Sequence, residues 1–234
     1  MLSGLAWLTL EVKYLERALS FYTDHLDLPV IDRTATEAIL GVGDSELRLR
    51  TPGPVPRGGL HTHYAFAIPR GEYDQWKARL GEQFDLDEHQ FGSASSLYCY
   101  DPDGHCVELG QFAEEGSGIT GIFEVVLEVE SLDRALAVYT GLGGEVVDRG
   151  EARRRARLDL GPVDIELWEP QLGIADGRGG VHVDLGFRAD DPTAVADAIA
   201  EDVCSVTYLD DGTAPPETVR IKDPDGHYLT IRRE

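Results

Sequence analysis

The second half of this chain repeats the first half. EVKYLERALSFYT (residues 11–23) and EVESLDRALAVYT (residues 128–140) are identical at eight of thirteen positions and lie 117 residues apart. DPDGH occurs at 101–105 and again at 223–227, and we align His63 with His182 in a similar register. A repeat of this length must build the same supersecondary unit twice, so it constrains the fold more than any other feature.

Each half divides once more into two similar modules. LAWLTLEV (residues 5–12) alternates in polarity like a half-buried strand, and apolar residues at helical spacing follow it. The same order recurs after HYAFAI, FEVVLEV and HVDLGF. We therefore predict an α+β protein of four βαβββ modules, paired into two open-barrel domains joined by a short polar linker. The predicted boundaries are 1–112 for the first domain (modules 1–50 and 60–111), 113–118 for the linker, and 119–234 for the second domain (modules 119–170 and 180–233).

The charge of the chain excludes one class of partner. It has 43 acidic and 21 basic residues, a net charge of -22, and only three lysines. Nucleic acid would be repelled. A strongly acidic, lysine-poor surface is typical of proteins from very salty cytoplasm, so we expect a halophilic source.

The sequence offers no signal for export or membrane insertion. No apolar run reaches the roughly 20 residues of a membrane helix, and the N-terminal residues alternate in polarity. We expect a cytoplasmic protein that does not associate with membranes. The three cysteines have no CxxC spacing, which argues against a disulfide framework or a thiolate zinc site.

The order of the motifs resembles one known family. Four modules with helices such as LERALSFYTDHL, an internal HYAF strand and a closing DPDGHxxE strand resemble the vicinal oxygen chelate superfamily of glyoxalase I, extradiol dioxygenases and bleomycin-resistance proteins. The resemblance implies barrels whose concave faces hold a divalent metal through the first and last strands of each module. It also implies a small-molecule substrate with vicinal oxygens, and it allows a homodimer.

Strand alternation indicates which side chains face each predicted cleft. For the first domain the set is Trp7, Arg48, His63 and Glu108, and for the second it is Glu124, Glu166, His182 and Thr230. Neither set contains the full His/Glu/His/Glu ligands that the resemblance to glyoxalases implies, or the two histidines and one carboxylate of the extradiol enzymes.

We expect the first cleft to have lost its metal. An ion pair between Arg48 and Glu108 can replace the cation. The alternative is a metal triad of His61, His63 and Glu108, because His61 lies two residues before His63 and hence on the same face of a regular strand.

In the second cleft we expect Glu124, Glu166 and His182 to hold iron, manganese, nickel or zinc, with Thr230 leaving room for water or substrate. The alternative is that the arginines of RRRAR (residues 153–157), including Arg155 and Arg157, neutralise the glutamates or receive an anionic substrate.

Two functions follow from these alternatives. The first is a metalloenzyme of extradiol dioxygenase or glyoxalase type, with Glu166 as a catalytic carboxylate. The second is a metal-free binding protein of the bleomycin-resistance type, in which Trp7 stacks on a small molecule and Arg48 pairs with its anionic group.

Overall fold

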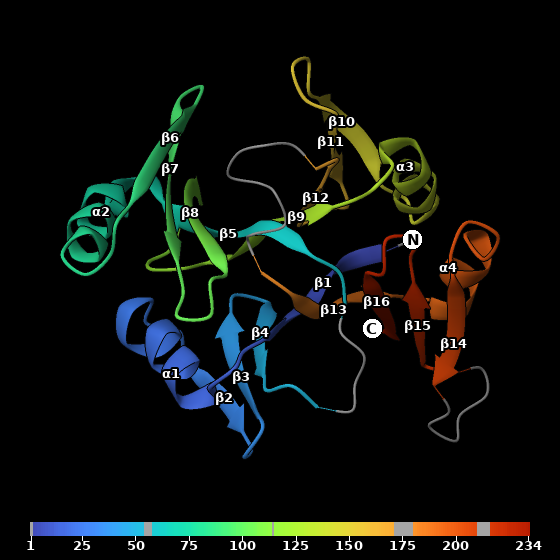
Figure 1. Cartoon of the computed structure of the whole chain (residues 1–234), viewed down its shortest axis with the longest axis horizontal. Helices are drawn as coiled ribbons and strands as arrows, with labels where there is room; N and C mark the ends of the chain where they lie inside the picture. Colours follow the sequence, from blue (N-terminus) through green and yellow to red (C-terminus); the bar gives the residue numbers. More distant parts are fainter. Residues whose placement is uncertain (1, 54–57, 114, 171–179, 210–215) are drawn as a thin grey trace.

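Four modules, each of one strand, one helix and three further strands, follow one another along the chain (Figure 1). They are seen in a computed structural model that describes residues 2–53, 58–113, 115–170, 180–209 and 216–234. Residue 114 of the predicted linker lies outside these ranges.

The elements of the first two modules have the following bounds. The first contains β1 (Leu2–Glu11), α1 (Leu15–Ser20) extended by a π-helical turn (Phe21–His25), β2 (Val30–Arg33), β3 (Glu37–Val42) and β4 (Ser45–Arg50). The second contains β5 (His61–Pro69), a 3-10 turn (Arg70–Glu72), α2 (Tyr73–Gly81), β6 (Asp87–Phe91), β7 (Ala94–Tyr100) and β8 (Cys106–Ala113).

The last two modules repeat this order. The third contains β9 (Gly121–Glu128), α3 (Leu132–Gly141), β10 (Glu145–Arg149), β11 (Arg155–Asp159) and β12 (Asp164–Trp168). The fourth contains β13 (His182–Ala189), α4 (Pro192–Ala198), β14 (Ser205–Leu209), β15 (Thr218–Lys222) and β16 (Tyr228–Arg233).

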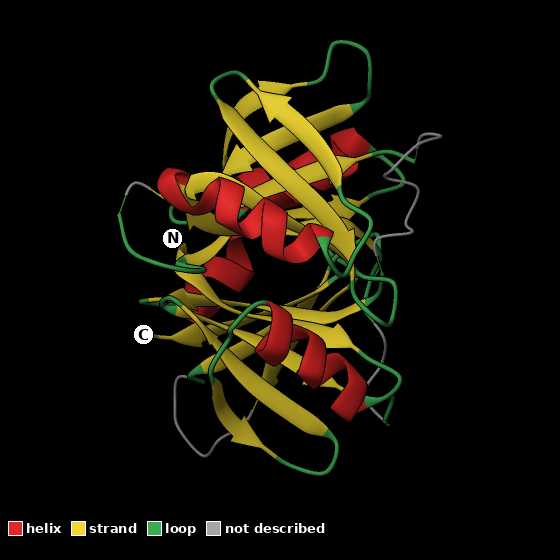
Figure 2. Ribbon diagram, turned by 90° about the vertical axis from the view of Figure 1, so that its left-hand side faces the viewer, coloured by secondary structure: helices red, strands yellow, loops and turns green. Residues whose placement is uncertain are grey.

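Local sequence signals place the helices. The Ser131 hydroxyl accepts a hydrogen bond from the backbone of Arg134 at the start of α3, and Asp191 does the same at α4, where Pro192 occupies the first turn. Apolar side chains on one face of each helix are buried against the strands, and Figure 2 shows the helices lying against the sheets. No helix in the described ranges is long and apolar enough to cross a membrane.

The strands form two eight-stranded sheets, each built from modules of both halves. One sheet has the order β14-β15-β16-β13-β1-β4-β3-β2 and the other β10-β11-β12-β9-β5-β8-β7-β6. We call them the 1–4 sheet and the 2–3 sheet after the modules they contain. The α+β class, the four modules and the two curled sheets are as predicted.

The pairing of the modules corrects the sequence prediction. Neighbouring modules within residues 1–112, or within 119–234, do not share a sheet; instead β1 pairs with β13, and β5 pairs with β9, both antiparallel. β9 begins only a few residues after β8 ends, and short connections favour neighbours in space. The polar linker at 113–118 therefore joins two modules of one sheet instead of separating two barrels.

Candidate metal centre

The 2–3 sheet brings four ionisable side chains to one buried cluster. His63 comes from β5, Glu108 from β8, Glu124 from β9 and Glu166 from β12. Ala65 lies opposite both Glu108 and Glu124 in the strand register, so the two carboxylates flank the same stretch of β5. All four side chains are buried, with exposed fractions of 7% or less.

The imidazole of His63 lies between two of the carboxylates. Its Nε2 is 3.2 Å from Oε2 of Glu108 and 3.7 Å from Oε2 of Glu124. One ligand atom from each of these residues lies within 4.8 Å of the other two. Nδ1 of His63 is 3.1 Å from the hydroxyl of Thr62, an interaction that holds the ring with Nε2 toward the carboxylates.

Two arginines on β11 face the glutamates. Arg155 pairs with Glu166 and also with Asp148, whose Oδ2 is 2.8 Å from Nη1 of the arginine. Nε of Arg157 lies 3.4 Å from Oε1 of Glu124. The predicted neutralisation of the glutamates by this arginine run is thus partly realised.

Burial and charge shift the pKa values of the cluster in opposite directions. Burial alone lowers the pKa of His63, but the hydrogen bonds and charges of Glu108 and Glu124 outweigh it and raise the pKa to about 10. Burial raises the pKa of Glu108, yet the hydrogen bond and charge of His63 bring it below its usual value. The pKa of Glu166 is raised by burial and then by the charge of Glu124, which Arg155 only partly offsets.

The residues present fit a divalent cation. Three carboxylates face two guanidinium groups, and the remaining negative charge is balanced either by a proton on His63 or by a cation. Oε2 of Glu108 is buried without a well-aligned hydrogen bond among the described residues. One imidazole nitrogen and several carboxylate oxygens are ligands suited to manganese, iron, nickel or zinc.

His182 does not join this cluster, which corrects the predicted ligand set. Its ring stacks on His227 at a centroid distance of 5.0 Å, with an interplanar angle of 11°. In the other half, His61 stacks on His105 in the same way, at 5.3 Å and 13°. The true counterpart of His182 is therefore His61, and the spacing of the two DPDGH motifs is the sequence signal that supports this register.

A β-bulge explains why His61 also lies outside the cluster. The pairing of β5 with β9 shifts between His61 and His63, so the two-residue alternation breaks at this point and the two histidines face different surroundings. Nε2 of His61 lies 3.3 Å from Nδ1 of His105. A triad of His61, His63 and Glu108 does not form.

The corresponding positions of the 1–4 sheet hold Trp7, Arg48, Asp184 and Thr230. The predicted ion pair between Arg48 and Glu108 is absent, because the two residues lie in different sheets. Arg48 instead pairs with Glu46 at 2.6 Å and lies over the Trp7 ring at 4.0 Å. Sequence reasoning missed Asp184, which aligns with His63 once His61 is matched to His182.

Thr230 and Trp7 both donate to Asp184. The Thr230 hydroxyl is 2.7 Å from Oδ2, and Nε1 of Trp7 is 3.2 Å from Oδ1. Thr230 therefore does not open a metal site beside Glu166, as the sequence analysis expected. At the four ligand positions of the 1–4 sheet, Trp7, Asp184 and Thr230 thus hydrogen-bond one another, and Arg48 lies over Trp7.

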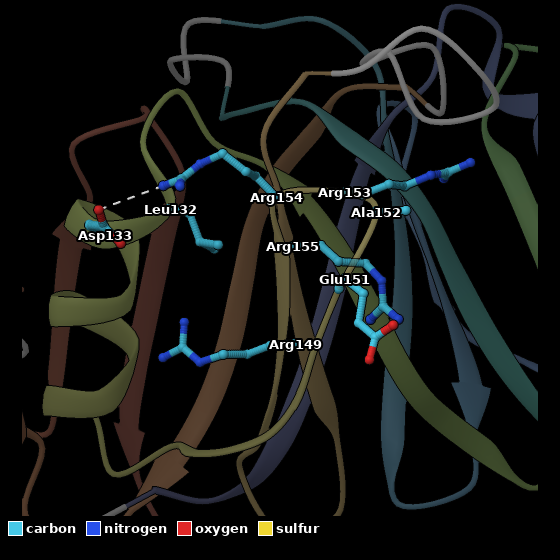
Figure 3. A pocket seen from close by; sticks show the side chains of 9 residues that line it. Leu132, Asp133, Arg149, Glu151, Ala152, Arg153, Arg154 and Arg155 are labelled. Carbon is cyan, nitrogen blue, oxygen red and sulfur yellow. Dashed lines mark ion pairs between the residues drawn. The ribbon is translucent and has the colours of Figure 1, made fainter.

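An arginine-rich hollow lies between the start of α3 and the residues that lead into β11. It has a volume of about 330 Å³ and is lined by Arg149 and Arg153–Arg155 together with the start of α3. Figure 3 shows Arg154 directed toward α3, where it pairs with Asp133 at 3.6 Å, whereas Arg153 and Arg155 point to the other side. Since Arg155 also pairs with Glu166, the hollow and the metal cluster share a residue.

Comparison with known proteins agrees with this arrangement. The sequence model of the Glyoxalase/Bleomycin resistance protein/Dioxygenase superfamily matches residues 4–109. Glutathione transferase FosA of Serratia marcescens is 32% identical over 117 residues, which are 47% of this chain and 81% of that protein. The chain belongs to this superfamily. Metallothiol transferase FosB of Staphylococcus haemolyticus is 27% identical over 116 residues, 47% of this chain and 84% of that protein.

Two solved structures match nearly the whole chain. Glyoxalase I from Zea mays has a TM-score of 0.71 at 18% identity and covers 98% of this chain and 92% of that chain. A Bacillus subtilis protein has a TM-score of 0.76, also at 18% identity, and covers 99% of this chain and 85% of that chain. At this identity the likeness shows the two-sheet fold alone.

Proposed function

We propose that this superfamily member is a metalloenzyme that acts on a small anionic substrate with adjacent oxygen atoms. The observation that carries the proposal is the buried convergence of His63, Glu108 and Glu124, with ligand atoms within 4.8 Å of one another. Glu166 lies beside them on β12. Glu124 keeps its predicted role as a metal ligand, and Glu166 keeps its predicted role as the catalytic carboxylate. His63 and Glu108 take the place of His182 as ligands.

The donor set favours one class of chemistry. A divalent ion held by these residues supplies Lewis-acid polarisation of a substrate oxygen. The cluster has a single imidazole, whereas the two-His-one-carboxylate set of non-haem iron oxygenases requires two. A glyoxalase-type isomerisation or a thiol transfer is therefore better supported than an extradiol dioxygenase reaction.

Glu166 is suited to move a proton. A buried carboxyl whose pKa is raised binds a proton more readily than an ordinary glutamate, and this favours a role as general base. Its pairing with Arg155 fixes the carboxylate at the edge of the metal cluster. We assign Glu166 the transfer of a proton at a carbon or thiol of the substrate.

The arginines near the cluster favour a substrate with a negative charge. Arg155 pairs with Glu166 and Arg153 lies over the Trp168 ring at 5.1 Å, and a guanidinium binds a carboxylate or phosphonate with two parallel hydrogen bonds. Two relatives are named for transfer of glutathione or of a thiol, and their names agree with a thiol-containing anionic substrate for this chain.

Metal analysis tests the proposal directly. Protein purified without chelators or affinity tags is expected to contain about one divalent ion per chain, and calorimetric titration with manganese, nickel and zinc should give one site. His63→Gln and Glu124→Gln should weaken binding at least about a hundredfold, whereas the exposed Glu88→Gln should not. Metal-free protein, or a Glu124→Gln variant that binds as tightly as wild type, would contradict the metal site.

The reaction is tested with two substrates. Isomerisation of a glutathione hemithioacetal and addition of a thiol to an epoxide phosphonate are measured on the metal-loaded protein. Glu166→Gln is expected to lower turnover at least about a hundredfold while it retains most of the metal affinity. Loss of metal together with activity would make Glu166 a ligand and leave the base unidentified.

A further inference from the structure

The cleft of the 1–4 sheet contains a second small cavity, about 130 Å³ in volume. It is lined by Trp7, Thr9, Glu37, Arg48, Arg50, Val183, Asp184, Arg220 and Tyr228. This volume holds roughly four water molecules at liquid density. It is large enough for one small polar group and too small for a whole drug-sized ligand.

Three of the four side chains at the metal-ligand positions hydrogen-bond one another, and the fourth is an arginine, so this cavity does not suit a metal ion. Both oxygens of Asp184 accept hydrogen bonds, one from Trp7 and one from Thr230. The indole of Trp7 lies so close to Gly186 that a Cβ there would come within 2.1 Å of it. The aromatic ring thus packs directly against the backbone of β13.

The cavity presents unused hydrogen-bond donors. The hydroxyl of Thr9 is buried, with an exposed fraction of 2%, and has no partner among the described residues. Thr9 lies directly opposite Arg48 on one side and Asp184 on the other, in the middle of the cleft. An unpaired buried hydroxyl is costly unless a ligand or water completes it.

Three arginines, Arg48, Arg50 and Arg220, line the same cavity as this hydroxyl. Arg48 uses only two of its five N–H groups on Glu46, and Arg220 has its Nε 3.3 Å from the Thr230 hydroxyl. Arg50 forms no ion pair with any described residue. The cavity therefore has more free donors than acceptors, although Glu37 also lines it and lies opposite Arg50 in the strand register.

We infer that this cavity is a binding site for a small oxyanion, a carboxylate or phosphate group, independent of the metal centre. Thr9 donates one hydrogen bond, and the guanidinium groups of Arg50, Arg48 and Arg220 supply the remaining donors. The chain as a whole has a net charge of -22 and repels anions, but three arginines line this cavity and attract an anion locally.

Calorimetric titration of the whole protein with inorganic phosphate, and separately with acetate, tests the inference. One saturable site is expected, with a dissociation constant of about 1 mM or tighter for the preferred anion. The two titrations distinguish a phosphate from a carboxylate ligand. Absence of saturable binding of either anion overturns the inference.

Two variants and a matched control locate the site. Thr9→Val and Arg50→Gln should each weaken binding at least about tenfold. Valine already occupies the equivalent place in the 2–3 sheet at Val126, so the fold accommodates Thr9→Val. Arg17→Gln changes the net charge by the same amount on the exposed face of α1 and should leave binding unchanged. Equal effects of Arg17→Gln and Arg50→Gln would show general electrostatics and overturn the site.

Removal of the metal separates this inference from the proposed function. The titration is repeated on protein that has been stripped of metal and freed of chelator by gel filtration. Unchanged binding supports a site in the 1–4 sheet. Binding that disappears with the metal assigns the anion to the metal centre and overturns the inference, while the proposed metalloenzyme would stand.

Discussion

At the scale of single residues, the packing of the 1–4 sheet depends on the absence of a side chain at Gly186. It lies opposite Trp7 in the strand register, and a Cβ on it would approach the indole to 2.1 Å. The equivalent pair in the 2–3 sheet is Ala65 and Glu124, where a methyl group is accommodated. The indole of Trp7 therefore leaves no room for a side chain at position 186.

Gly186→Ala should lower the free energy of unfolding by about 1–3 kcal/mol, because the added methyl group overpacks the ring. Trp7→Leu removes the clash, so in a double-mutant cycle the alanine should cost much less in the Trp7→Leu background. Urea unfolding of the four proteins measures this coupling. Additive effects of the two changes would contradict the contact.

His182 makes stability depend on pH. Burial, followed by the neighbouring His227 and His105, holds the pKa of His182 well below its usual value. The unfolded chain therefore binds a proton that the folded chain does not, and stability falls as the pH drops below about 6.5. Above that value this contribution is constant.

The free energy of unfolding is measured against pH for wild type and for His182→Asn. The difference between the two curves removes the contribution of the carboxylates, including the nearby Asp223. Between pH 6 and pH 5 the wild type should lose up to about 1.4 kcal/mol per pH unit more than the variant. His89→Asn, at an exposed position, should follow the wild-type curve. Parallel curves for wild type and His182→Asn would show that His182 is protonated in the fold.

At the scale of elements, the sequence predicts the four modules but not which modules share a sheet. Polarity alternation in β1 and helical spacing after it identify a module without any tertiary knowledge. However, β1 and β5 are similar strands, and either β5 or β13 is a chemically acceptable neighbour for β1. The choice depends on connection lengths and on side-chain fit across the whole sheet, which local patterns do not contain.

The candidate site was partly predictable for the same reason. Strand alternation selects Glu124, Glu166, His63 and Glu108, which the structure brings together in one buried cluster although the sequence analysis divided them between two clefts. It fails between His61 and His63, where the bulge inserts an extra residue and shifts the alternation. A bulge has no reliable signature in a single sequence.

The module pairing leads to a prediction about the separated halves. The fragment 1–112 contains β1 and β5, whose residues are almost entirely buried in the whole chain, but lacks their partners β13 and β9. Exposed apolar strand edges associate with other chains. We expect this fragment to be unfolded or to self-associate, and to form a 1:1 complex with the fragment 113–234.

Light scattering after gel filtration and circular dichroism of the separate and mixed fragments test this prediction. The mixture should recover the unfolding transition of the intact protein. A monomeric fragment 1–112 with its own cooperative transition would show that adjacent modules can pair, as the sequence analysis proposed.

For the whole molecule, the dominant long-range force is self-repulsion. The net charge is -22, and three carboxylates gather in the metal cluster alone. Screening shortens the Debye length from about 30 Å at 0.01 M salt to about 3 Å at 1 M, so repulsion between exposed carboxylates should largely vanish in molar KCl. If the protein is halophilic, its stability must rise steeply over this range.

We expect the thermal unfolding midpoint to increase continuously from dilute to molar KCl, and we attribute the increase to surface charge. A variant in which the exposed Glu82, Asp85 and Asp87 are replaced by their amides should be more stable than wild type in dilute buffer and should gain less from added salt. Sucrose at equal osmolality controls for exclusion of solutes from the surface. A midpoint that stays flat in KCl, or a variant whose salt dependence equals that of wild type, would mean that the acidic surface imposes no appreciable cost and that the composition reflects something other than adaptation to salt.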